Sequence, residues 1–234
     1  MTRLWENPHL QNPYPGAYVP HPAIGPRVMS LDQWIEYSAP AIWIDFLRRV
    51  EPQLDGLRYA VRVLALASRR ALSGVSGDGI QACLAAVSAS EAWAESPTAS
   101  NSEAAKTGSL ALQPLAEEAA QQAYRGHYDA LMASAKGYAG IVALVEECTK
   151  SRKLGYAVGA AHALAHAVGY HTAMPKKLPP RKSWHRGMEF YTDQYENAID
   201  ALDMASSLAC LSIGDGHEQW RQYSDLVRLI RERK

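Results

Sequence analysis

The chain has 234 residues, 47% of them hydrophobic, which is long enough for one domain with a sizeable core. Its 24 basic and 24 acidic residues cancel, and this neutral total gives no support to nucleic acid or an anionic membrane as a partner. Three widely spaced cysteines argue against a disulfide framework and a cysteine-based zinc site.

Composition also predicts the fold class. The chain contains 38 alanines, the best helix-forming residue, and only two phenylalanines. Runs in which Val, Ile or Thr alternate with polar residues are scarce, so we predict an all-α protein. The N-terminus lacks the pattern of a signal peptide, and no run of about 18 apolar residues occurs. We therefore expect a cytoplasmic protein that does not bind a membrane.

Residues 1–29 are predicted to form an extended arm, because six of the 13 prolines lie there and proline disfavours helix. The arm also carries Trp5, Tyr14 and Tyr18. These aromatic side chains suggest an arm that packs, either across its own domain or on another subunit or partner. Residues 30–234 are predicted to form a single all-helical domain.

The first helical elements have clear sequence signals. Ser30 and Gln33 form a capping-box pattern that opens a helix, Pro40 should kink or split this helix near Ala39, and Pro52 should end it. Apolar periodicity then predicts helices over 54–72 and 78–95.

The rest of the chain is predicted to continue as helices joined by short links. Pro114 suits the first turn of a helix, so residues 98–111 and 113–125 are predicted to be two separate helices. Further helices are expected over 127–150, 153–173, 188–212 and 217–232. The total is eight to ten helices, which would fit a compact bundle or a short α-solenoid.

The alanine-rich segment 153–173 is free of charged residues between Lys153 and Lys176 and is predicted to be a central, largely buried helix. His162 and His166 lie one turn apart on it, a spacing that helical metal sites use. A third ligand would have to come from elsewhere, for example from His185, Asp193 or Glu196. The same face also holds three glycines, which instead favours two packed histidines where another helix comes close: Gly155, Gly159 and Gly169.

Two charged segments are candidates for binding. Asp193, Glu196 and Asp200 lie on an acidic face of the 188–212 helix, which is either a solvated face or a docking surface for a basic partner. Residues 175–187 form a basic loop with Trp184 and His185. Such a loop could hold phosphate or RNA, although a solvated loop fits the neutral chain better.

Two stretches carry a resemblance to known proteins. They are Ala85-Ala86 with Ala92-Trp93-Ala94, Pro97, Asn101 and Ala104-Ala105, and the later run from Gly159 to Ala167. Over roughly residues 55–175 the chain resembles uncharacterised alanine-rich helical proteins of bacteria associated with type VI secretion. It is also similar to helical immunity proteins of polymorphic toxin systems. Neither resemblance implies functional residues.

The sequence therefore favours a non-enzymatic protein-binding module, such as an immunity protein or an adaptor of a bacterial toxin or secretion system. The expected partner-binding residues are Trp5, Tyr14, Tyr18, Asp193, Glu196 and Asp200. Two alternatives remain open: a metal-dependent enzyme that uses His162 and His166, and a structural subunit that forms homo-oligomers through its arm. For the leading hypothesis we expect neither a cofactor nor nucleic acid binding.

Overall fold

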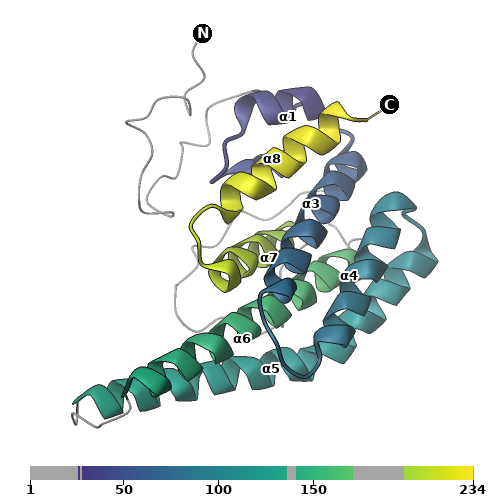
Figure 1. Ribbon diagram of the computed structural model, residues 1–234. Helices are drawn as coiled ribbons and strands as arrows, with labels where there is room; N and C mark the ends of the chain where they lie inside the picture. The colour runs from purple at the N-terminus through teal and green to yellow at the C-terminus, as the bar shows by residue number, and fades with distance from the viewer. Residues whose placement is uncertain (1–25, 27, 136–140, 171–197, 234) are drawn as a thin grey trace, which may run out of the picture.

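The computed structural model describes residues 26, 28–135, 141–170 and 198–233, without the side chains of 119–120 and 122–148. Over these residues the chain forms a bundle of eight helices, which confirms the all-α prediction (Figure 1). None of the described helices is both long and apolar enough to cross a membrane. The helices are α1 (Leu31–Tyr37), α2 (Trp43–Leu47), α3 (Gln53–Ser73), α4 (Ile80–Glu95), α5 (Ala99–Ala135), α6 (Ile141–Gly169), α7 (Ala198–Ile213) and α8 (Glu218–Arg231).

The second half of α6 lies at the centre of the bundle, as the sequence predicts. Helices α3, α4, α5 and α7 all contact α6. Buried residues occur on every side of it, and ten side chains between positions 157 and 168 are at most 2% exposed: Ala157, Val158, Ala160, Ala161, His162, Ala163, Leu164, Ala165, Ala167 and Val168. A helix that is apolar all round belongs in a core, and small side chains let several neighbours approach it.

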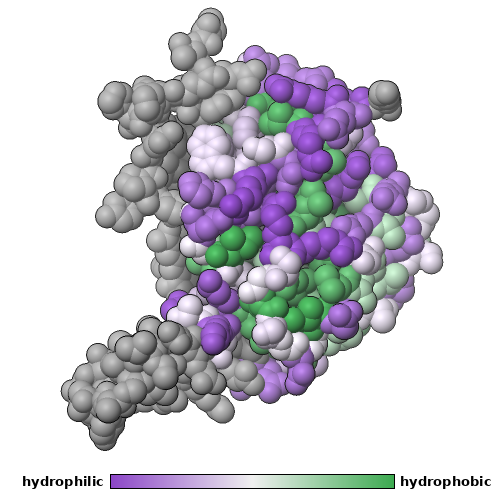
Figure 2. All heavy atoms as spheres, in the orientation of Figure 1, coloured by the Kyte–Doolittle hydropathy of each residue, from purple (hydrophilic) through white to green (hydrophobic). Residues whose placement is uncertain are grey.

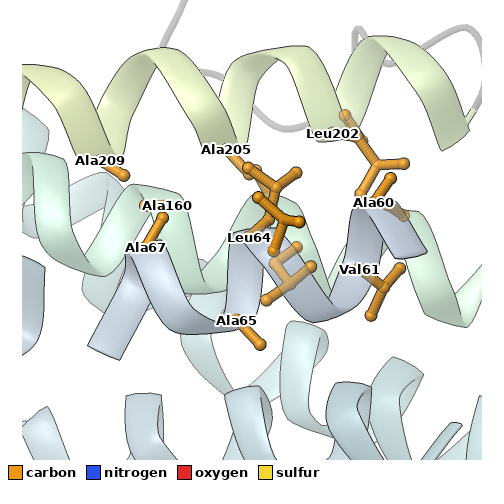
Figure 3. Packing of buried hydrophobic residues seen from close by; sticks show 14 of the residues in the cluster. Ala60, Val61, Leu64, Ala65, Ala67, Ala160, Leu202, Ala205 and Ala209 are labelled. Carbon is orange, nitrogen blue, oxygen red and sulfur yellow. The ribbon is translucent and has the colours of Figure 1, made fainter. Parts of the chain in front are cut away.

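Small residues also pack at the contact between α3 and α7. Figure 3 shows side chains of these two helices that point toward one another, with Ala160 of α6 close by. All of them belong to one hydrophobic cluster that runs from Met29 to Ile230. The labelled residues at this contact are Ala60, Leu64 and Ala67 of α3 and Leu202, Ala205 and Ala209 of α7.

The N-terminal capping box is confirmed. The Ser30 hydroxyl accepts a hydrogen bond from the Gln33 amide at 3.3 Å, and the Gln33 side chain accepts one from the Ser30 amide at 3.0 Å. The predicted break at Pro40 is also confirmed, because α1 ends at Tyr37 and α2 begins only at Trp43. The Trp34 indole N–H donates to the Trp43 carbonyl at 2.8 Å and so ties the two short helices together.

The prediction of two helices over 98–111 and 113–125 is wrong, because α5 continues through Pro114. A proline inside a helix removes one backbone hydrogen bond, whose acceptor here would be the Leu110 carbonyl. Pro114 is exposed, and Leu110 is 54% exposed. Water can therefore satisfy this carbonyl, while Leu112 and Ala116 on the buried face hold the helix together.

The predicted boundaries around residue 150 are also wrong. The expected helix over 127–150 is divided between α5 and α6, and α6 runs without a break through Lys150 to Lys153. This polar stretch contains no glycine or proline, which are the residues that most disfavour a helix. The helix therefore continues through it. The expected helix over 188–212 corresponds to α7, and positions 188–197 lie outside the described residues.

Charged side chains fasten α8 to α3. The carboxylate of Glu218, only 1% exposed, accepts from the Arg70 guanidinium at 2.7 Å, and Asp225 accepts from it at 2.8 Å. Burial disfavours the charge of Arg70, but these two carboxylates outweigh that effect and raise its pKa above the ordinary value. These ion pairs link α8 to α3, and within α8 Glu218 also pairs with Arg221 at 3.5 Å and Asp225 with Arg228 at 2.8 Å.

The tight contact between α5 and α6 gives a stability prediction. A Cβ atom added at Gly169 would lie 2.6 Å from the Lys106 Cα atom, which belongs to the α5 backbone. We expect Gly169→Ala to lower the free energy of unfolding by roughly 1–3 kcal/mol, the usual cost of overpacking.

Two other glycines serve as matched controls in urea-unfolding measurements. At Gly159 the nearest atom is a flexible Leu208 methyl group at 3.0 Å, and at Gly74 the nearest contact is an ordinary 3.7 Å. The destabilisation should therefore decrease in the order Gly169→Ala, Gly159→Ala, Gly74→Ala. Equal effects at all three positions would contradict the close approach.

Candidate functional site

Most of the partner-binding residues suggested by the sequence lie outside the described residues. The same is true of the basic loop 175–187 and of the candidate third metal ligands. These residues are Trp5, Tyr14, Tyr18, Trp184, His185, Asp193 and Glu196. Their roles stay predictions.

Asp200 is the exception, and its expected exposure is wrong. Its side chain is 11% exposed and pairs with Arg48, which follows α2, at 2.6 Å. The acidic residue therefore faces another part of the bundle and not solvent. A helical wheel of α7 alone could not reveal this, because it does not show that an arginine from 152 positions earlier lies against the polar side of the helix.

His162 meets α5, as the packing hypothesis expects. The His162 Nε2 atom lies 3.3 Å from the Ser109 hydroxyl of α5, within hydrogen-bond distance. The His166 ring stacks on Tyr170 with 4.4 Å between ring centroids, and the Lys106 ammonium lies over the same tyrosine at 5.8 Å. One turn before Lys106 in α5, the Ser102 hydroxyl donates to the Val168 carbonyl at 3.0 Å.

The environment of His162 favours a neutral side chain with a packing role. Burial, and to a lesser degree the neighbouring His166, lower its pKa to about 4. Its ring centroid lies 6.0 Å from that of His166. Within the described part of the chain, no third histidine, cysteine, aspartate or glutamate joins the pair to form a metal-binding cluster.

The described cysteines are not poised for chemistry. Burial raises the pKa of the Cys83 thiol to about 11 and that of the Cys210 thiol to about 12. Reactive cysteines instead have a lowered pKa, since the thiolate is the nucleophile. Both thiols are free, as the spacing of the cysteines suggests.

A surface groove of about 570 Å³ is a candidate binding feature among the described residues. It forms where the beginning of α1, the beginning of α3, the end of α4 and the C-terminal residues meet. Figure 2 shows hydrophilic residues over much of the upper part of the molecule, where α1 and α8 lie. Six lining residues carry charge or an aromatic ring: Glu51, Asp55, Arg58, Tyr59, Arg62 and Arg233.

Two of the lining residues are arginines of α3, Arg58 and Arg62. Arg58 donates from Nε to the Ala94 carbonyl at 2.7 Å and from Nη2 to the Glu95 carbonyl at 3.2 Å, both at the end of α4. Arg62, one turn later, is exposed and forms no ion pair with another described residue. Arg233 instead pairs with Asp32 of α1 at 2.7 Å.

The sequence contains only part of the signal for this groove. Arg58 and Arg62 lie four residues apart on the polar side of a predicted helix, which usually indicates a solvated face. The C-terminal Arg233 and the link before α3 border the same groove only because α8 docks beside them. Comparisons of the chain with family models, with curated proteins and with solved structures found no match.

The buried histidine predicts a pH dependence of stability. The folded-state pKa of His162 is about 4, below the ordinary value of about 6.5, so the unfolded chain takes up the proton first as pH falls. Between about pH 7 and about pH 4.5 this difference should remove about 2 kcal/mol from the free energy of unfolding.

Urea unfolding of His162→Gln, which lacks the ionisable group, should show a correspondingly smaller loss over the same range. His217→Gln changes an exposed histidine and serves as the control for removal of an imidazole. A profile of His162→Gln identical to that of the unsubstituted protein would show that His162 is not held neutral in the fold.

Proposed function

We propose that the protein is a non-enzymatic module that binds another protein, as an immunity protein or an adaptor of a bacterial toxin or secretion system does. We further propose that the groove is its binding surface. The observation that carries the proposal is the pair Arg58 and Arg62, which line an open groove beside Tyr59. Arginine and tyrosine are over-represented among the residues that contribute most binding energy at protein interfaces.

The way in which Arg58 is held supports this assignment. Its two hydrogen bonds to carbonyls of α4 fix the long side chain before any partner arrives. Ordering a flexible side chain costs about 0.5–1.5 kcal/mol on binding, so an arginine that is already ordered gives a stronger contact. Neither carbonyl carries a formal charge, so the positive charge of Arg58 remains available.

The buried His162 is better explained by packing than by catalysis. The His162 Nε2 atom is engaged with Ser109, and the ring is 2% exposed. A catalytic metal needs an open coordination position that substrate can reach. The groove, in contrast, is open to solvent and is lined by side chains suited to recognition.

The proposal predicts a specific cross-link. With a photoreactive amino acid at Tyr59, the protein in its native cells should give one dominant adduct with another protein. Adding Arg62→Glu should abolish this adduct, because the substitution reverses a charge in the groove. Mass spectrometry of the adduct identifies the partner.

Arg152→Glu serves as the matched control. Arg152 is likewise an exposed arginine, but it lies on α6 beside Tyr156 and away from the groove. The adduct should persist in this variant. An adduct insensitive to Arg62→Glu, or one lost equally with Arg152→Glu, would show that the groove is not the binding surface.

A further inference from the structure

The two groove arginines also indicate what kind of segment would bind, if the groove is the binding surface proposed above. We infer that the ligand is an extended acidic segment of a different protein, with carboxylates on alternate residues. One carboxylate would pair with Arg58 and the next with Arg62. The inference rests on the spacing of the two arginines, on their charge and on the distribution of acidic residues in this chain.

The spacing fits an extended chain. Arg58 and Arg62 are four residues apart on α3, so their positions are separated by about 6 Å along the helix axis and share one side of the helix. In an extended strand, residues two apart lie on the same side and are separated by about 6.6 Å. Carboxylates at alternate positions therefore match the spacing of the two arginine positions on the helix, whereas adjacent carboxylates point to opposite sides.

The charge of the two arginines is only weakly balanced within the protein. Asp55 lies 3.7 Å from the Arg58 Nη1 atom, which is beyond hydrogen-bond distance, and both side chains are more than a third exposed. Arg62 forms no ion pair with a described residue. Arginine binds carboxylates through two parallel hydrogen bonds, which gives such a contact direction as well as energy.

Acidic residues of the groove limit its affinity for an acidic segment. Glu51 and Asp55 also line it and repel a carboxylate-bearing ligand. Glu51 is exposed, so Glu51→Gln should remove this repulsion without disturbing the fold. The substitution should tighten binding, and added salt should weaken it, as expected for exposed charges.

The protein's own sequence points to a different protein as the source of the ligand. No two of its 24 acidic residues are two positions apart, so neither the chain itself nor a second copy supplies the alternating pattern. Residues 1–25 contain a single acidic residue, Glu6, and one basic residue, Arg3. The proline-rich arm therefore lacks the charges that the groove arginines would bind.

Two peptides of equal composition test the inference. One repeats the unit Glu-Thr, and the other repeats Glu-Glu-Thr-Thr, in which no two glutamates are two positions apart. In fluorescence anisotropy with the full chain, the first should bind more tightly by roughly fivefold or more, a difference of about 1 kcal/mol. Arg62→Gln should remove this preference, Arg152→Gln should keep it, and Glu51→Gln should tighten binding of the first peptide.

Equal affinity for the two peptides, no measurable binding of the first, or a preference that survives Arg62→Gln would each overturn the inference. Circular dichroism of the Arg62→Gln protein checks that its fold is retained. The cross-link at Tyr59 tests the groove as a binding surface separately from its preference for alternating carboxylates. If an Arg62-dependent adduct forms while the peptides do not discriminate, the groove binds a protein through other chemistry; if both fail, the proposed function fails as well.

Discussion

The structure depends on how closely other helices can approach α6. Four helices contact it, and six of the ten side chains that are at most 2% exposed in its second half are alanine. At Gly169 even a methyl group would collide with the α5 backbone. Such close contact maximises van der Waals attraction, but it also means that a larger side chain at these positions has no space. The polar groups at this contact are hydrogen-bonded across it, as with Ser102 and Val168.

The proposed binding surface is a consequence of this packing and of one charged contact. Because α6 and α7 place α3 centrally, Arg70 can pair with Glu218 and Asp225 and so dock α8 on α3. The docking of α8 brings the C-terminal residues beside α1 and the beginning of α3, where the groove forms. The residues that line the groove come from distant positions in the chain. A substitution at the contact between α3 and α8 would therefore alter the groove even though the substituted residue does not line it.

Local signals in the sequence predicted the local structure well. The capping box at Ser30, the break at Pro40 and the buried alanine-rich helix could all be predicted from short patterns. The errors arose where tertiary packing outweighs a local signal: Pro114 is tolerated because it faces water, and Asp200 is buried because Arg48 lies against it. The groove could not be predicted for the same reason, since periodicity assigns residues to a face of a helix but does not show which distant segment borders that face.

The central claim is that tightly packed α6 forms the most stable part of the bundle. Hydrogen exchange of backbone amides measures this directly, because amides that open only on global unfolding exchange slowest. We predict that the amides of Ala157 to Val168 are the slowest to exchange, and that those of α1, which is short and has Trp34 as its single buried residue, exchange through local opening. Exchange in α6 as fast as in α1 would contradict the account.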